Sequence, residues 1–169
     1  MNAIEIERKY LIRMPDVQRI SAMDGCVRWE IVQTYLQDGP NGETRRVRRI
    51  FTEGREQLFF TEKLRLSQLS SIEREREIDR GEYEALLAQA DPESRSVEKL
   101  RLRVPYEGQL LEIDIYSFWN DRATLEIEMQ SEDQALQLPD WIEIIRDVSG
   151  DFSYKNRMLA KRVPMESIG

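Results

Sequence analysis

Residues 99–104 read KLRLRV, and residues 111–115 read LEIDI. Charged and apolar residues alternate strictly in both stretches, which is the period of a β-strand with one polar and one apolar face. Similar alternation continues along most of the chain, at residues 3–12, 26–37, 44–52, 57–66, 72–78, 96–105, 110–116 and 123–129. The sequence therefore predicts about eight strands in an antiparallel sheet or barrel.

Helices are expected between and after these strands. Asp79 and Glu82 form a capping box ahead of an apolar stripe of helical spacing, which predicts a helix over residues 79–90. Three further short helices are expected at residues 135–137, within 139–148, and from about 151 to 161. No linker divides the chain, so residues 1–169 are expected to form a single α+β domain.

The composition excludes several kinds of site. The 169 residues include 25 Lys and Arg, 32 Asp and Glu and no histidine, which gives a net charge of −7. Without histidine there is no serine–histidine triad and no histidine-ligated zinc, so a general base must be a carboxylate, lysine, tyrosine or metal-bound water. Cys26 is the only cysteine, which excludes an intrachain disulfide and a cysteine metal cluster.

The sequence also bounds location and partners. The longest stretch without a charged residue has seven residues, 31–37, which is too short to span a bilayer, and the N-terminus carries no apolar signal core. We therefore expect a cytoplasmic protein with no membrane partner. The acidic balance argues against nucleic acid, and the basic run at 45–49 would divide between two faces of a strand. The oligomeric state, a homodimer included, stays open.

Charges on the polar faces sort by sign from strand to strand. The acidic pairs are Glu5 with Glu7, Glu73 with Glu75, Glu112 with Asp114 and Glu126 with Glu128; the basic sets are Arg46 with Arg48, Lys63, and Lys99 with Arg101 and Arg103. A half-exposed sheet with a solvated charged face is the simpler interpretation, but such faces more usually mix both signs within a strand. Sorted faces favour a barrel whose charged face points inward and whose apolar face is covered by helices outside.

Such an interior suits a polyanion and a metal ion. Carboxylate pairs on adjacent strands would converge on a divalent cation, and ligands that are all oxygen favour Mg²⁺ or Mn²⁺ over zinc. Arginine pairs would hold phosphate groups through bidentate contacts. The eight glycines form no Gly-rich phosphate loop, so phosphates would have to be bound by side chains.

The chain resembles the CYTH domain, or triphosphate tunnel metalloenzyme superfamily. Residues 5–9, EIERK, match the Glu-x-Glu-x-Lys signature of that family. The resemblance covers nearly the whole chain, through RVR at 46–48, TEK at 61–63, VEKLR at 97–101, EID at 112–114, EIE at 126–128 and YKN at 154–156. It implies an eight-stranded tunnel that binds triphosphate compounds together with Mg²⁺ or Mn²⁺.

The resemblance also implies roles for single residues. The implied metal ligands are Glu5, Glu7, Asp114, Glu126 and Glu128, with Glu73, Glu75 and Glu112 as auxiliary acids. The implied phosphate-binding residues are Arg46, Arg48, Lys63, Lys99, Arg101 and Lys155. Short bacterial members pair the motif lysine with a tyrosine, here Lys9 with Tyr35, to orient or deprotonate the attacking water. Ser71 departs from the family, because similar proteins carry a basic residue there; Arg74 or Arg76 would replace it only if a bulge shifted the register.

The implied activity is metal-dependent hydrolysis of inorganic triphosphate to pyrophosphate and phosphate. Class IV adenylyl cyclase and thiamine triphosphatase use the same tunnel but need a pocket for an organic group, which the sequence does not reveal. A non-catalytic polyphosphate- or nucleotide-binding module would be favoured by loss of the motif lysine, yet Lys9 is present. A structural sheet protein would show no thermal shift with triphosphate.

Overall fold

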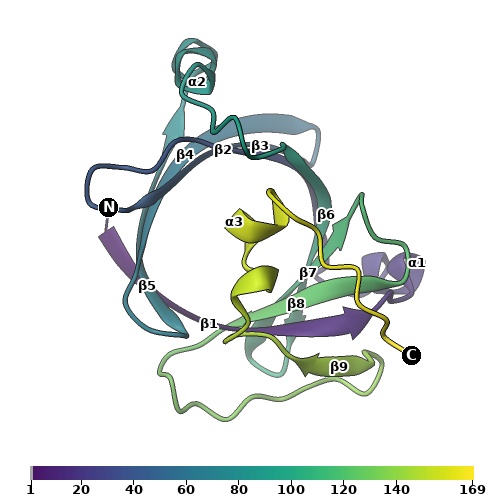
Figure 1. Cartoon of the computed structure of the whole chain (residues 1–169). Helices are drawn as coiled ribbons and strands as arrows, with labels where there is room; N and C mark the ends of the chain where they lie inside the picture. The colour runs from purple at the N-terminus through teal and green to yellow at the C-terminus, as the bar shows by residue number, and fades with distance from the viewer. Residues whose placement is uncertain (1) are drawn as a thin grey trace.

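Eight antiparallel strands close into a barrel in the computed structural model, which describes residues 2–169 (Figure 1). The strands are β1 (Asn2–Arg13), β2 (Val27–Tyr35), β3 (Thr44–Thr52), β4 (Arg55–Arg65), β5 (Ser70–Ile78), β6 (Val97–Tyr106), β7 (Gln109–Tyr116) and β8 (Arg122–Glu128). Their order is β5-β4-β3-β2-β6-β7-β8-β1, and a β1–β5 pairing closes the ring. The predicted eight-stranded antiparallel barrel with a charged interior is confirmed.

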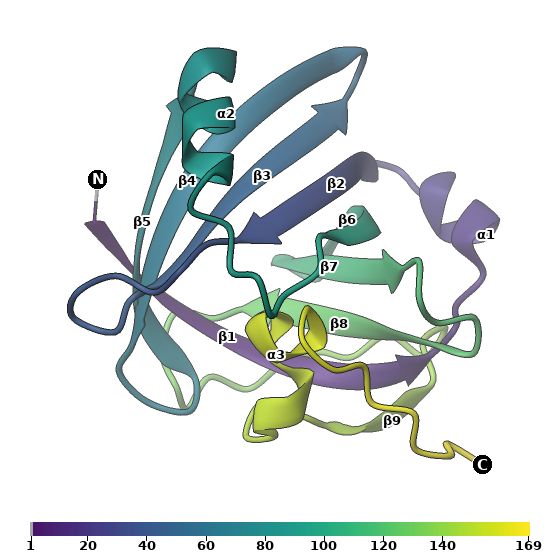
Figure 2. The same cartoon turned by 45° about the horizontal axis from the view of Figure 1, so that its top comes forward.

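The closure depends on β1, whose two edges have different neighbours. Residues 7–13 of β1 pair with β8, whereas residues 2–6 pair with β5. A ninth strand, β9 (Ile144–Asp147), pairs with β1 at Tyr10–Ile12 and extends the sheet beyond the point where β5 ends (Figure 2). Long β1 therefore joins the barrel to an added strand.

The prediction of a helix within residues 139–148 is wrong, because part of this segment forms β9. Its backbone pairs with the edge of β1 that β5 leaves open, and Ile142 and Trp141 pack on the barrel wall. Residues 135–137 are also not helical, although the Gln134 side chain accepts a hydrogen bond from the Gln130 backbone N–H as a cap would.

The last predicted helix is divided in two. A 3₁₀ turn, η1 (Phe152–Tyr154), precedes α3 (Asn156–Leu159), and Lys155 between them has an extended backbone with ψ of 140°. In Figure 1, which looks along the barrel, η1 and α3 lie within the ring of strands. They lie across one end of the barrel, whereas the prediction placed the helices outside.

Two other helices do pack outside the barrel. The helix α2 (Arg80–Leu87) confirms the predicted one, and the Asp79 side chain accepts from the Glu82 backbone N–H as expected. The short helix α1 (Val17–Ser21) was not predicted, because five residues are too few to show helical periodicity. No helix within residues 2–169 is long and apolar enough to cross a membrane.

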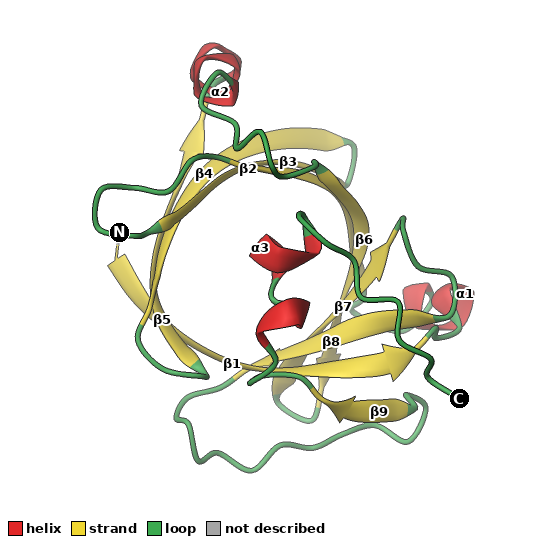
Figure 3. Cartoon of the chain, in the orientation of Figure 1, coloured by secondary structure: helices red, strands yellow, loops and turns green. Residues whose placement is uncertain are grey.

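Two of the three hydrophobic clusters lie on the outer face of the barrel, and the third, which includes Leu11, Tyr116 and Leu159, lies beneath the segment η1–α3 at one end of the interior. One cluster includes Ile113, Leu125 and Ile127, which are fully buried beneath the segment that holds Ile142 and beneath α1. A second cluster includes Val47 and Phe60, which pack against Tyr83 of α2. Strands make up most of the regular secondary structure, and the helices are short (Figure 3). Because the apolar faces are buried outside, the charged faces line the interior.

Candidate active site

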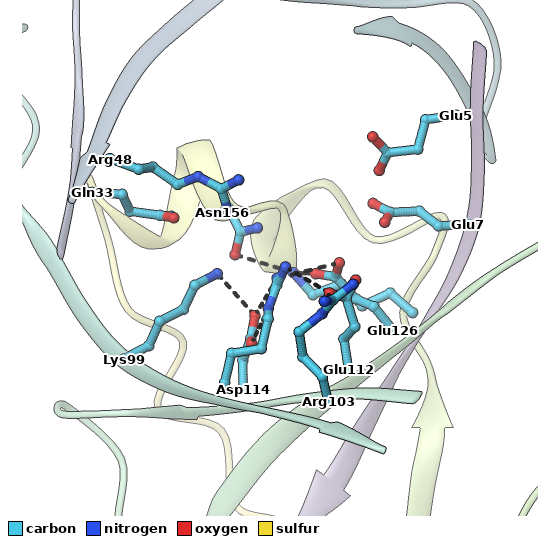
Figure 4. Close-up of polar contacts among 12 residues, drawn as sticks. Glu5, Glu7, Gln33, Arg48, Lys99, Arg103, Glu112, Asp114, Glu126 and Asn156 are labelled. Atoms are coloured by element: carbon cyan, nitrogen blue, oxygen red, sulfur yellow. Dashed lines mark hydrogen bonds and ion pairs between the residues drawn. The ribbon is translucent and has the colours of Figure 1, made fainter. Parts of the chain in front are cut away.

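Charged side chains from all sides of the barrel converge on its interior (Figure 4). The pairing register places Lys9 opposite Glu126, Glu112 opposite Glu126, and Arg101 opposite Asp114. Directly opposite residues of neighbouring strands share one face, so the register places a base beside an acid at β1–β8 and at β6–β7, and two acids together at β7–β8. The strand-by-strand sorting of charge thus becomes a set of ion pairs across the interior.

Asp114 lies at the centre of the most buried group of charges. Its fully buried carboxylate accepts from Lys99 Nζ at 2.8 Å and from Arg101 Nε and Nη2 at 2.8 and 2.9 Å. Burial alone would raise the pKa of Asp114, but Arg101 and Lys99 hold it well below its usual range. Burial likewise opposes protonation of Arg101, yet Asp114 and Glu112 raise its pKa well above the ordinary value. Both oxygens of Asp114 are therefore engaged in holding basic side chains.

Glu112 extends this network toward one end of the barrel. It accepts from Arg101 Nη1 and from Arg103 Nε, both at 3.1 Å. The guanidinium of Arg103 also lies over the ring of Trp29, 4.2 Å from its centroid. Trp29 thus packs against a charged side chain of the interior, whereas Trp141 packs in an outer hydrophobic cluster and Trp119 packs with Tyr154 beneath the terminal segment.

Lys63 is shared by three carboxylates from two other strands. Its Nζ lies 3.6 Å from Glu5, 3.7 Å from Glu7 and 3.8 Å from Glu73. Burial would lower the pKa of Lys63, but Glu7, Glu5 and Glu73 together raise it. Burial raises the pKa of Glu5, and Glu73 adds to this effect against the attraction of Lys63.

These three carboxylates surround the ammonium group of Lys63 and do not form a cluster of their own. Within residues 2–169 no three acidic side chains are close enough to hold a metal ion as they stand. Glu5, Glu7 and Glu73 nevertheless converge on one cationic atom, and all their donors are carboxylate oxygens. That donor set fits Mg²⁺ or Mn²⁺, for which oxygen ligands are preferred.

Arg46 and Arg48 project from β3 with unused hydrogen-bond donors. Arg48 Nη2 pairs with Glu75 at 3.1 Å, and Thr61 Oγ1 donates to the same carboxylate at 2.6 Å. The Nε atoms of both arginines are buried and have no hydrogen-bond partner within the described part of the chain. Burial and the charge of Arg46 lower the pKa of Arg48 to about 10, so its guanidinium stays charged at neutral pH. Buried donors without partners are rare, so these two Nε atoms leave hydrogen-bonding capacity that the described residues do not satisfy.

Lys9 and Tyr35 line the same cavity but bond to different partners. Lys9 Nζ donates to the carbonyl of Tyr154 at 2.7 Å and lies 3.5 Å from Asn156 Oδ1 and 3.6 Å from Glu126. The Tyr35 hydroxyl accepts from Gln33 Nε2 at 3.3 Å. Lys9 therefore connects β1 to the segment η1–α3 across the end of the barrel.

Two cavities meet inside the barrel, and Glu7 and Glu126 line both of them. The cavity nearer α3 has six cationic residues, and we call it the basic cavity: Lys9, Arg46, Lys63, Arg65, Lys155 and Arg157. The opposite cavity, which we call the acidic cavity, has Arg48, Arg101 and Arg103 beside seven carboxylates: Glu5, Glu7, Glu73, Glu75, Glu112, Glu126 and Glu128. The interior thus changes sign along the barrel axis.

Lys155 lies at the basic end, where its Nζ donates to the Ser149 carbonyl at 2.5 Å. Burial, then the charges of Arg65 and Lys9, lower its pKa to about 8. Lys99, in contrast, is sequestered with Asp114 and lines neither of the two interior cavities.

Ser71 is buried and faces Glu5 across the β1–β5 pairing. The described register of β5 contains no bulge, and Arg74 and Arg76 pair with Glu62 and Glu82. They therefore do not replace the basic residue expected at position 71. Arg65 is the cross-strand partner of Ser71 on β4 and lines the basic cavity.

Sequence reasoning missed several residues that line the interior. Thr61 shares a strand face with Lys63, and Tyr116 shares one with Asp114. The alternation along these two strands could therefore have revealed both residues. Arg65 and Arg157 lie at the end of a strand and in a short terminal helix, where no periodic signal marks them.

Comparison with known proteins gives matches among solved structures. No family model and no curated protein matches the chain. The inorganic triphosphatase NE1496 is 29% identical, with a TM-score of 0.56, over 95% of this chain and 100% of its own. The PH1819 protein of Pyrococcus horikoshii OT3 is 20% identical, with a TM-score of 0.58, over 77% of this chain and 80% of its own.

A third match is HpAC1 from Hippeastrum, for which a dominant triphosphatase activity is described. It is 18% identical, with a TM-score of 0.53, over 75% of this chain and 80% of its own, and this likeness concerns the fold alone. The barrel, its inward-facing charges and these matches agree with one another. The chain has the triphosphate tunnel fold of the CYTH superfamily.

Proposed function

We propose that this protein hydrolyses inorganic triphosphate to pyrophosphate and phosphate inside the barrel, with Mg²⁺ or Mn²⁺ as cofactor. The observation that carries the proposal is the change of sign along the interior, where a cavity with six cationic residues meets one rich in carboxylates. A chain of phosphates suits the first, and a divalent cation suits the second. The 29% identity with an inorganic triphosphatase over nearly the full length of both chains supports this choice of substrate.

The basic side chains bind and orient the phosphate chain. Arg46 lines the basic cavity and Arg48 lines the acidic cavity that meets it, and guanidinium groups suit charge-assisted hydrogen bonds to phosphate oxygens. Arg101 is aligned by Asp114 and Glu112, so its position is set before the substrate binds. Such preorganised donors stabilise negative charge without having to reorganise during the reaction.

Glu5, Glu7, Glu126 and Glu128 are the residues that we expect to hold the metal. The Oε1 atom of Glu126 is buried without a hydrogen-bond partner among the described residues, and Glu5 and Glu7 already converge on one cation. A bound divalent ion neutralises charge on phosphate oxygens and lowers the pKa of coordinated water. Asp114 was predicted as a ligand, but its engaged oxygens favour a role in positioning Arg101.

Lys9 and Tyr35 are proposed to orient the attacking water. Both line the basic cavity, and Lys9 lies beside Glu126, so the pair faces the place where the phosphate chain would meet the carboxylates. Glu73 and Glu75 fix Lys63 and Arg48, while Glu112 fixes Arg101 and Arg103. Catalysis would then rest on orientation and electrostatic stabilisation, with no covalent intermediate.

The test is phosphate release from tripolyphosphate, ATP and thiamine triphosphate, each with Mg²⁺ and with Mn²⁺. We expect tripolyphosphate to be the preferred substrate, chelator to abolish activity, and Glu126→Gln to abolish it without unfolding the barrel. Glu84→Gln on the exposed face of α2 is the matched control and should behave as wild type. Full activity in EDTA, comparable rates on ATP or thiamine triphosphate, or formation of a cyclic nucleotide would contradict the proposal.

A further inference from the structure

We propose that Asn156 binds the substrate: its side-chain amide donates a hydrogen bond to a phosphate oxygen in the basic cavity, and Tyr116 positions it. This inference rests on the proposed function and adds a neutral donor to the charged residues already described. Asn156 is the first residue of α3 and lines the basic cavity.

Two donors fix the orientation of this amide. The hydroxyl of Tyr116 lies 2.6 Å from Asn156 Oδ1, and Lys9 Nζ lies 3.5 Å from the same atom. An ammonium group can only donate, so the atom that faces Lys9 must be the amide oxygen. Tyr116 is buried, and its hydroxyl is held in its protonated, donating form by that burial and by nearby Asp114 and Glu126.

The amide nitrogen is consequently left as a donor that faces the cavity. Within residues 2–169, Nδ2 of Asn156 donates to no other group. Lys63 and Lys155 line the same cavity. A phosphate oxygen bound between those cations would be an acceptor within the same space, and an amide N–H suits it without adding charge.

Packing of the terminal segment does not depend on this nitrogen. The carbonyl of Tyr154 accepts from Lys9, and Tyr154 and Leu159 are buried in the cluster beneath the segment. A purely structural role for Asn156 would therefore use only its oxygen. The two roles can be separated, because an aspartate keeps an oxygen for Tyr116 and Lys9 but loses the N–H donor.

The experiment compares Asn156→Asp, Asn156→Leu and wild type. Binding is measured by calorimetry with a non-hydrolysable imido analogue of tripolyphosphate in the presence of Mg²⁺. A substrate-binding role predicts at least a roughly tenfold higher Kd for Asn156→Asp, because a hydrogen bond to a charged group is lost and a negative charge is added. Asn156→Leu should bind the analogue more tightly than Asn156→Asp does, because it adds no negative charge. A structural role predicts the reverse order, since aspartate keeps both existing contacts, and that order would overturn the inference.

Two further variants sharpen the result. Asn120→Asp makes the same charge change at an exposed position away from the cavities and should leave Kd unchanged. Tyr116→Phe removes the hydroxyl that orients the amide, so we expect KM to rise a few-fold with little change in kcat. That effect should disappear when Asn156 is already leucine, because the two residues would act as one unit. An unaltered effect of Tyr116→Phe in the leucine background would contradict the positioning role.

The outcomes separate this inference from the proposed function. A wild-type protein that binds the analogue but releases no phosphate from tripolyphosphate overturns the proposed function, while the order of the two Asn156 variants still decides the inference. Equal binding by wild type and Asn156→Asp overturns the inference even if turnover is fast. Failure of the wild type to bind the analogue overturns both.

Discussion

A partly buried ammonium group that lies near other cations loses its proton easily, and Lys155 is such a group. Burial, Arg65 and Lys9 lower its pKa to about 8, whereas the attraction of Glu7 is weaker. Lys155 is therefore protonated below about pH 8 and becomes neutral above it. Binding of an anion favours the protonated form, so the contribution of Lys155 to substrate affinity should be lost as pH rises through this value.

We accordingly expect KM for tripolyphosphate to increase between about pH 7 and about pH 9 because of this group, whose pKa is lowered. In Lys155→Arg the guanidinium stays charged over that range, so the additional increase should be absent. Titration of the substrate itself affects both proteins equally and cancels in the comparison. Parallel pH profiles of KM in wild type and variant would show that Lys155 is not responsible.

At the scale of strands, β6 and β7 are joined by buried ion pairs in addition to their backbone ladder. Asp114 on β7 satisfies both Lys99 and Arg101 on β6, and removal of its charge would leave two buried cations without their main partner. Breaking a buried pair in this way costs far more than losing a surface pair, because an uncompensated buried charge remains.

Asp114→Asn should therefore lower the free energy of unfolding by about 3–5 kcal/mol. Because the pKa of Asp114 is lowered in the folded state, its stabilising contribution is fully present at neutral pH and is lost only in acid. Urea unfolding at neutral pH measures the effect. Asp24→Asn at an exposed position is the control and should change stability by no more than about 0.5 kcal/mol. A loss below about 1 kcal/mol for Asp114→Asn would contradict this account of the network.

Strand alternation predicted all eight barrel strands because that pattern is local and repeats along each strand. The four-residue strand β9 could not be predicted this way, since it forms on an edge of β1 that only the closed barrel leaves open. The break at Lys155 in the last predicted helix and the five-residue α1 are equally beyond the reach of periodicity.

The candidate site was predicted only in part for a related reason. The alternation along a strand shows which side chains share a face, so the sequence predicted that Glu126 and Arg101 lie on the charged face. Register decides which of them pair, and this is why the full engagement of Asp114 by Lys99 and Arg101 was not foreseen.

For the whole molecule, net charge is a poor guide to the ligand. The chain carries −7, yet one end of its interior has six cationic residues beside two acids. Clefts lined by one sign of charge focus the electrostatic field, so this end should attract an anion even though the molecule as a whole repels it.

Arg65→Glu tests this view, because Arg65 lies at the exposed rim of the basic cavity. We expect kcat/KM for tripolyphosphate to fall by roughly tenfold at low ionic strength and to depend less on salt than in wild type. Arg95→Glu changes the net charge equally but lies at an exposed position that lines none of the described cavities. Equal losses in both variants would show that net charge matters and that the rim does not.

The ammonium group of Lys63 lies among the carboxylates of Glu5, Glu7 and Glu73, and this arrangement affects how the chain folds without metal. Many metal sites collect negative groups that repel one another until the ion arrives, and some domains stay unfolded without it. Here a counter-charge is built into β4 and offsets that repulsion from the moment the strands pair. Under the proposed function, folding of the barrel would therefore not depend on metal binding, and we expect the protein to fold in the presence of chelator.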